Sequence, residues 1–114
     1  MLARGGVGAN RARGLAFEEH VAGTRGEVLN RGAGRMSVMN SEGTWIPDFA
    51  SVAEAKAVHG ALSMTRQLRV AAQYARETGR QVTLYVLPDT TFSGRLEIAI
   101  AGGLFRVVRV VGFE

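Results

Sequence analysis

Residues 44–56 read TWIPDFASVAEAK, and this stretch decides how the middle of the chain folds. A short strand is predicted to end at Pro47, because proline has no backbone N–H to donate to a sheet. The alternating residues that follow predict another strand, in which Glu54 and Lys56 share one face. If the two strands pair as a hairpin, the carboxylates of Asp48 and Glu54 can face one point in space.

Two carboxylates held within a few ångström repel each other, so they are normally found with a cation between them or with one shared proton. Asp48 and Glu54 are therefore candidate ligands for Mg²⁺. Lys56 is the only lysine among the 14 Lys and Arg residues of the chain. A buried lysine can shift its pKa and orient or deprotonate a water molecule, which arginine cannot do. The competing interpretation is that Pro-Asp is a common turn and that Glu-x-Lys arises by chance.

The rest of the chain predicts a small α/β domain, with a mixed central sheet flanked by helices. The order is helix, three strands, helix, strand, a further element and strand, and the helix between strands implies a crossover with parallel pairing. We expect the long helix to be N-capped by Ser63 and to end at Gly79. The predicted elements are a helix at 14–21, strands at 35–40, 44–46 and 51–56, a helix at 62–78, a strand at 81–87, an element of ambiguous type at 92–103 and a strand at 105–111.

The length and composition describe one domain with a real core. The chain has 114 residues, of which 46% are hydrophobic. Residues 1–13 are rich in Gly and Arg and predict a flexible lead-in, which leaves 14–114 as the folded domain. No apolar run reaches the roughly 18 residues that span a bilayer, and the start lacks the apolar stretch of a signal peptide. The absence of cysteine excludes disulfides, thiolate metal sites and cysteine nucleophiles.

The basic charge indicates an anionic partner. The formal net charge is +4 and the pI is about 10.6, although a GC-rich genome would also favour arginine codons. Four arginines of the long helical segment recur at helical spacing away from its apolar stripe, which predicts a ridge that follows nucleic-acid phosphates. They are Arg66, Arg69, Arg76 and Arg80. The alternatives are an ordinary solvated helix face and a surface that meets an acidic inhibitor protein.

The motifs GLAFEEH, WIPDF, VAEAK and LSMTRQLR, followed by the strand QVTLYVL, stand in an order that resembles the PD-(D/E)xK superfamily of nucleases. Within that superfamily the chain looks most like the restriction-endonuclease-fold toxin domains at the C-termini of bacterial polymorphic toxins. The resemblance covers about residues 14–110, and it implies a restriction-endonuclease-like core.

The resemblance also implies a metal centre. Asp48 and Glu54 would be the main ligands for Mg²⁺ or Mn²⁺, and the carbonyl of Ala55 would be a further ligand. Glu18 would complete the metal shell from the first helix. Its neighbour Glu19 stays open as an alternative, although Glu18 directly follows the phenylalanine of the matching motif.

The resemblance implies that Lys56 positions and activates water for in-line attack on a phosphodiester, with Gln67 nearby as a polar residue from the next helix. Ala57 departs from the pattern, since these toxins often have asparagine at that position. The implied function is a metal-dependent nuclease, with DNA as the expected substrate. The alternatives are a repair or restriction-type nuclease and a nucleic-acid-binding domain without catalysis.

The biology that the resemblance implies is that of a secreted antibacterial effector. The chain would be the C-terminal fragment of a larger effector, which acts in the cytoplasm of a target bacterium. A cognate immunity protein would block it in the producing cell.

Overall fold

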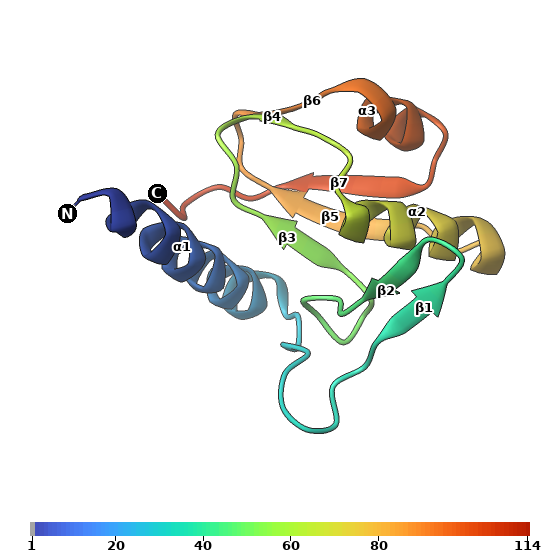
Figure 1. Ribbon diagram of the computed structural model, residues 1–114, viewed down its shortest axis with the longest axis horizontal. Coiled ribbons are helices and arrows are strands. Elements are labelled where there is room, and N and C mark those ends of the chain that lie inside the picture. Colours follow the sequence, from blue (N-terminus) through green and yellow to red (C-terminus); the bar gives the residue numbers. More distant parts are fainter. Residues whose placement is uncertain (1) are drawn as a thin grey trace.

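Three parallel strands form the central sheet of the computed structural model, which describes residues 2–114 and the side chains from Gly8 onward (Figure 1). The strand order is β3-β5-β7, and each neighbouring pair is parallel. These strands are β3 (Glu54–Lys56), β5 (Val82–Val86) and β7 (Phe105–Arg109). Parallel neighbours need crossover connections, and α2 and α3 lie in the two crossovers.

The helices cover both faces of this sheet. They are α1 (Leu2–Arg25), α2 (Arg66–Thr78) and α3 (Gly94–Ala101). Alternation along β5 sends Leu84 into a core shared with α2 and α3, and Tyr85 into a core shared with α1. Glu54 and Lys56 are in register with Leu84 and Val86, so they lie on the face that α2 covers.

Four short strands form two small additional sheets. The antiparallel pair is β1 (Val38–Asn40) with β2 (Gly43–Trp45), and the parallel pair is β4 (Gly60–Leu62) with β6 (Thr90–Phe92). Strands β1 and β2 contact α2. Parallel and antiparallel pairing therefore both occur, as the sequence predicts, but they belong to separate sheets and the central sheet is wholly parallel rather than mixed.

The elements with a strong local pattern match the prediction. Helix α2 ends as expected at Gly79, whose φ of 71° places it in the left-handed region that glycine adopts easily. Its N-cap is Thr65 rather than Ser63, because the Thr65 side chain accepts a hydrogen bond from the amide of Leu68. Strands β5 and β7 lie inside their predicted ranges. The ambiguous segment 92–103 contains the end of β6 and the whole of α3.

Other predictions were wrong. Helix α1 begins at Leu2, so residues 2–13 are helical rather than a flexible lead-in, and Met1 lies outside the described residues. Strand β3 begins only at Glu54, because Val52 has a φ of 63° and cannot continue a strand. Strands β4 and β6 were not predicted, since pairing of three residues each leaves no periodic signal in the sequence.

Candidate active site

A tight reversal of the chain brings Asp48 back beside the start of β3. Phe49 and Ala53 form an antiparallel bridge, and the positive φ of Val52 closes the turn between them. The amide of Ala55 donates to Asp48 Oδ2 at 2.9 Å, and the amide of Asp48 donates to Glu54 Oε1 at 3.3 Å. The expected hairpin is thus reduced to one bridge, but it still brings the two carboxylates together.

Glu54 is an almost completely buried carboxylate that is surrounded by donors. It is 2% exposed. Trp45 Nε1 donates to its Oε1 at 3.0 Å, and Lys56 Nζ lies 3.3 Å from its Oε2. A buried carboxyl group without such partners would be strongly destabilising, so these contacts explain how the fold tolerates Glu54 in its interior. Trp45 is itself buried in the core, and its indole N–H also orients this carboxylate.

Lys56 links β3 to the first turn of α2. Its Nζ donates to Gln67 Oε1 at 3.0 Å while it pairs with Glu54. The Lys56 side chain is 23% exposed, so the amine is held from two sides but can still be reached from solvent. The structure therefore brings Glu54, Lys56 and Gln67 together, although Gln67 belongs to α2 and β4 lies between β3 and α2 along the chain.

Helix α1 contributes Glu18 to the same place. The Glu18 side chain is 18% exposed and pairs with Arg31 at 3.2 Å, whereas Glu19 is 63% exposed. Burial, and next to it the negative charge of Asp48, raises the pKa of Glu18 to about 7. Of the two neighbouring glutamates, it is therefore Glu18 that faces Asp48.

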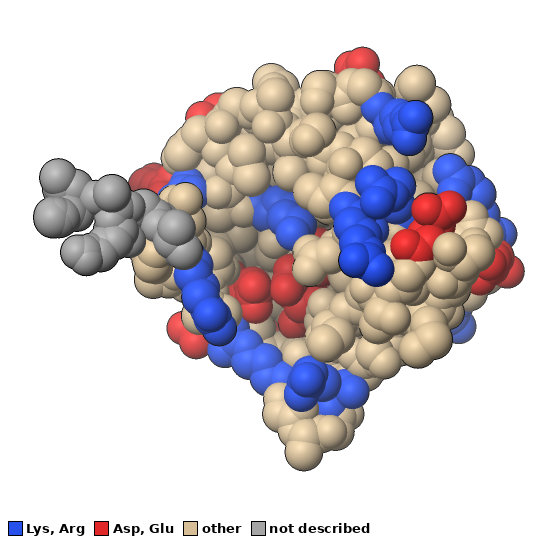
Figure 2. All heavy atoms as spheres, viewed as in Figure 1, with Lys and Arg blue, Asp and Glu red and all other residues tan. Residues whose placement is uncertain are grey.

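These groups line one cavity of about 550 Å³. Figure 2 shows a hollow in the middle of this face, with acidic side chains gathered inside it and basic side chains around its edge. A negative interior with a positive surround suits an anionic polymer that is held by the edge and meets a cation inside. The cavity is lined by Asn10, Arg13, Gly14, Glu18, Asp48, Glu54, Ala55, Lys56, Ala57, Val58 and Gln67.

The charges in the cavity favour a cation. Burial, and next to it the negative charge of Glu54, raises the pKa of Asp48 to about 7. Asp48 thus lies between two other carboxylates, and Lys56 brings a positive charge to the same place. Among the side chains described from Gly8 onward, no three Asp, Glu, His or Cys groups already form a closed ligand set. The donor chemistry nevertheless fits Mg²⁺ or Mn²⁺, which prefer carboxylate and carbonyl oxygens and retain several waters.

Three positioning residues escaped prediction from the sequence. Asn30 donates through Nδ2 to the carbonyls of Met36 and Pro47, and its amide donates to the carbonyl of Asp48 at 2.9 Å. Arg31 pairs with Glu18, and Arg13 donates to the carbonyl of Ala57. No local pattern identifies such residues, because each acts on a segment that is distant in sequence. For Asn30, the sequence offers one signal, which is its position next to a Gly-rich stretch.

Of the four arginines predicted to bind nucleic acid, Arg66, Arg69 and Arg76 lie within α2 and Arg80 does not. All four are exposed, but Arg80 follows the Gly79 cap and so lies beyond α2. Arg69 and Arg76 line a second cavity, away from the one that contains Lys56. The helical register predicted from the spacing holds only up to Thr78, because the left-handed conformation of Gly79 breaks it.

His59 belongs to a different cluster. Its Nδ1 lies 2.7 Å from Asp89 Oδ2 and its Nε2 lies 2.7 Å from Glu114 Oε1, so both ring nitrogens face carboxylates. Hydrogen bonding to Asp89, and then to Glu114, raises the pKa of His59. Arg13 Nε also contacts Glu114 Oε2, at 2.6 Å. His59 therefore ties the last residues of the chain to the β5–β6 connection instead of lining the site.

We expect His59→Gln to lower the melting temperature slightly at pH 6 and to have no effect at high pH. Since the pKa of His59 is raised in the folded state, its stabilisation is fully present below its unfolded pKa and disappears as the pH rises through the folded value. Thermal unfolding of both proteins from pH 5.5 to 9 measures this difference. A difference that stays constant across that range would contradict the assigned contact.

Helices among residues 2–114 lack the combination of length and hydrophobicity that a bilayer span requires. Comparison of the chain with protein-family models, with characterised proteins and with solved structures finds no match. The function is therefore argued from the residues and geometry of the cavity that contains Asp48, Glu54 and Lys56.

Proposed function

We propose that the protein is a Mg²⁺-dependent nuclease that hydrolyses phosphodiester bonds, with DNA as its expected substrate. One observation carries the proposal: Asp48, Glu54 and Lys56 meet in one cavity, and Glu18 and Gln67 reach it from two different helices. This is the residue set that the PD-(D/E)xK resemblance assigns to the site. The hydrogen bonds that gather these residues do not depend on that resemblance.

The roles follow from the chemistry of each group. Asp48 and Glu54 would hold the divalent cation, with the Ala55 carbonyl and Glu18 as further ligands. Such a cation, when bound, polarises the scissile phosphate and lowers the pKa of its water. Lys56 is held beside Glu54 by Gln67, where its ammonium can orient a water molecule and its neutral amine form can accept a proton from that water.

The arrangement around β3 supports a restriction-endonuclease-like core as part of this proposal. Helix α1 packs on β3, β3 carries Glu54 and Lys56, and a crossover through α2 leads to the parallel strand β5. The strand that bears the charged groups thus lies between a helix before it and a helix after it. Both helices send a polar side chain to the cavity, namely Glu18 and Gln67.

The biological setting that we propose is the toxin domain of a secreted effector, neutralised by a cognate immunity protein and active in the cytoplasm of a target bacterium. Support for this setting comes from the motif order and from the net charge of +4, which suits both nucleic acid and an acidic inhibitor. A repair or restriction-type nuclease would use the same cavity. A neighbouring gene for a small acidic protein would favour the toxin.

The purified protein is expected to nick and linearise plasmid DNA in Mg²⁺ or Mn²⁺ and to do nothing in EDTA. The physical reason is that three carboxylates and one amine cannot stabilise the charge of the transition state without a divalent cation. Agarose gels with plasmid and with a structured RNA, run side by side, measure the cleavage and the preferred substrate. If neither nucleic acid is cut with either metal, the protein is a binding module and the nuclease proposal fails.

A further inference from the structure

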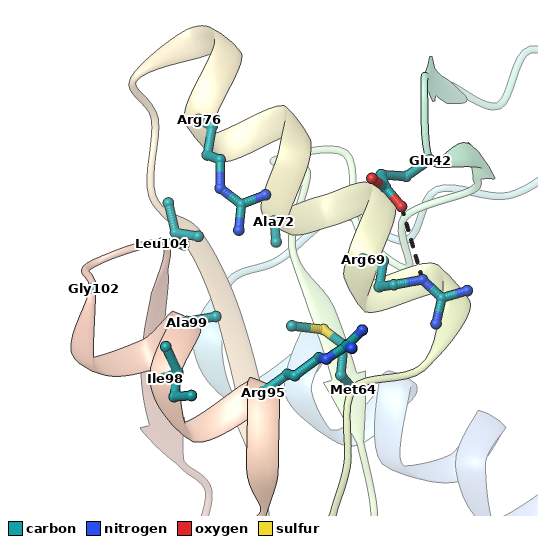
Figure 3. A pocket seen from close by; sticks show the side chains of 10 residues that line it. All are labelled: Glu42, Met64, Arg69, Ala72, Arg76, Arg95, Ile98, Ala99, Gly102 and Leu104. Atoms are coloured by element: carbon teal, nitrogen blue, oxygen red, sulfur yellow. Dashed lines mark ion pairs between the residues drawn. The ribbon is translucent and has the colours of Figure 1, made fainter.

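A second cavity lies between α2 and α3 (Figure 3), and the cavity with Lys56 does not share its lining. Its volume is about 540 Å³, which is in the range of small-molecule sites. Three of its lining residues are arginines and the others are mostly apolar. The lining consists of Glu42, Met64, Arg69, Ala72, Arg76, Arg95, Ile98, Ala99, Gly102 and Leu104.

The arginines of this cavity point to an anionic ligand. Figure 3 shows the Arg76 side chain extending into the cavity from α2, and that of Arg95 from α3. Arg69 lies at the edge, 3.9 Å from Glu42. Neither Arg76 nor Arg95 forms an ion pair with a carboxylate among the described residues, and the only side-chain partner of Arg76 there is the neutral Gln73. Two guanidinium groups that line one cavity, neither of them paired with a carboxylate of the described residues, suit phosphate oxygens.

The floor of the cavity is apolar. Ala72 and Ala99 are buried beneath it, and Met64 and Leu104 form parts of its wall. Ile98 is 73% exposed at the edge, although it is a large aliphatic side chain. A simple phosphate site would leave this apolar surface without a function, whereas a planar base can cover it and stack on a guanidinium group.

Helix α2 separates this cavity from the candidate active site. Gln67 faces Lys56, whereas Arg69 and Arg76 are about 200° and 180° around the helix from it, on the opposite side. A helix with its side chains is about 10–12 Å wide, so a strand that passes α2 needs two or three nucleotides to connect the two cavities. The spacing fits one substrate strand that occupies both.

We propose that this second cavity binds an unpaired nucleotide of the substrate strand, with its phosphates on Arg76 and Arg95 and its base on the apolar floor. The proposal rests on the proposed nuclease function for the identity of the strand. A base inside a duplex cannot enter a cavity without leaving its stack, so the site selects single-stranded or locally unwound nucleic acid. It therefore adds a preference that the active site alone does not impose.

Binding is tested in EDTA, where no cleavage is expected, by fluorescence anisotropy with a labelled 12-nucleotide single strand and a hairpin duplex of the same sequence. The proteins are the wild type, the double variant Arg76→Gln/Arg95→Gln and the control Arg106→Gln. Arg106 is exposed and lies on the other face of the sheet, in register with Thr83. All three proteins are first compared by thermal unfolding. Glutamine preserves helix propensity at Arg76 and Arg95, which are exposed positions of α2 and α3.

The double variant is expected to bind the single strand at least about tenfold more weakly, and the duplex less than about threefold more weakly. The slope of log binding constant against log salt concentration, measured with the single strand, should become less steep by about 1.4. This corresponds to two lost phosphate contacts at about 0.7 each. A single strand with abasic sites should bind the wild type more weakly than the unmodified strand does, because it keeps the phosphates for Arg76 and Arg95 but has no base to cover the apolar floor. Equal losses on single strand and duplex, or losses no greater than those of Arg106→Gln, would overturn the proposal. Because EDTA removes cleavage from the readout, failure here leaves the nuclease proposal intact, and failure of plasmid cleavage leaves this result interpretable.

Discussion

Lys56→Ala is expected to slow plasmid cleavage in Mg²⁺ by about 10²–10⁴-fold, the range lost with a general acid or base. The Lys56 ammonium pairs with the buried Glu54 at 3.3 Å and its charge also acts on the neighbouring Asp48. Without it, no side chain at this position can orient the attacking water or take its proton. Single-turnover cleavage with excess enzyme measures the chemical step apart from product release, and anisotropy in EDTA tests whether nucleic-acid binding survives.

Lys56→Arg separates chemistry from structure. Arginine retains the charge and can still pair with Glu54, so the fold is expected to remain as stable as that of the wild type. Its guanidinium does not give up a proton, so cleavage should stay close to the alanine level. If Lys56→Arg were as active as the wild type, a cation at this position would suffice and water activation by the amine would be wrong.

Asp48→Asn is expected to slow cleavage by at least about 10²-fold. At the same time it is expected to raise the free energy of unfolding of the metal-free protein by about 1–3 kcal/mol. Burial and the negative charge of Glu54 both disfavour an ionised Asp48. Asparagine removes this repulsion, and its carbonyl oxygen can still accept the hydrogen bond from Ala55. Ordinary structural residues destabilise the protein when they are replaced, so the opposite sign identifies a residue retained for its chemistry.

The pH dependence of this effect has a definite sign. The pKa of Asp48 is raised in the folded state to about 7, so the folded protein holds this proton more tightly than the unfolded chain does. The destabilisation by Asp48 is absent below about pH 4, grows between about pH 4 and pH 7, and is constant above the folded pKa. Urea unfolding in EDTA at pH 5 and pH 8 should therefore show the larger gain for Asp48→Asn at pH 8.

Added Mg²⁺ completes the test of Asp48. Millimolar Mg²⁺ should raise the melting temperature of the wild type at pH 8 and leave Asp48→Asn nearly unchanged, because a ligand stabilises only the state that binds it. Asp89→Asn is the matched control, since Asp89 is the other aspartate of the chain and its side chain is 59% exposed. A wild-type melting temperature that does not respond to Mg²⁺ or Mn²⁺ would contradict a metal centre at Asp48.

Local patterns were enough for part of the fold. Helix α2 and strand β5 were predicted because an apolar stripe, a glycine stop and strict alternation are all written in consecutive residues. The start of α1 was not predicted, because residues 2–13 contain several glycines, and glycine has a low helix propensity. Strands β4 and β6 follow β3 and β5 along the chain, so the pairing of β3 with β5 brings β4 and β6 together.

The sequence by itself determined the chemistry of the candidate site: a Pro-Asp turn, Glu54 and the single lysine stand within ten residues, so their proximity follows from one chain reversal. The tertiary structure alone decided that Glu18 rather than Glu19 faces Asp48, and that Gln67 holds Lys56. It also decided that arginines from two helices line one second cavity. The physical reason is that these contacts join segments whose relative position is set by the packing of α1, α2 and α3 on the sheet, and no local pattern encodes that packing.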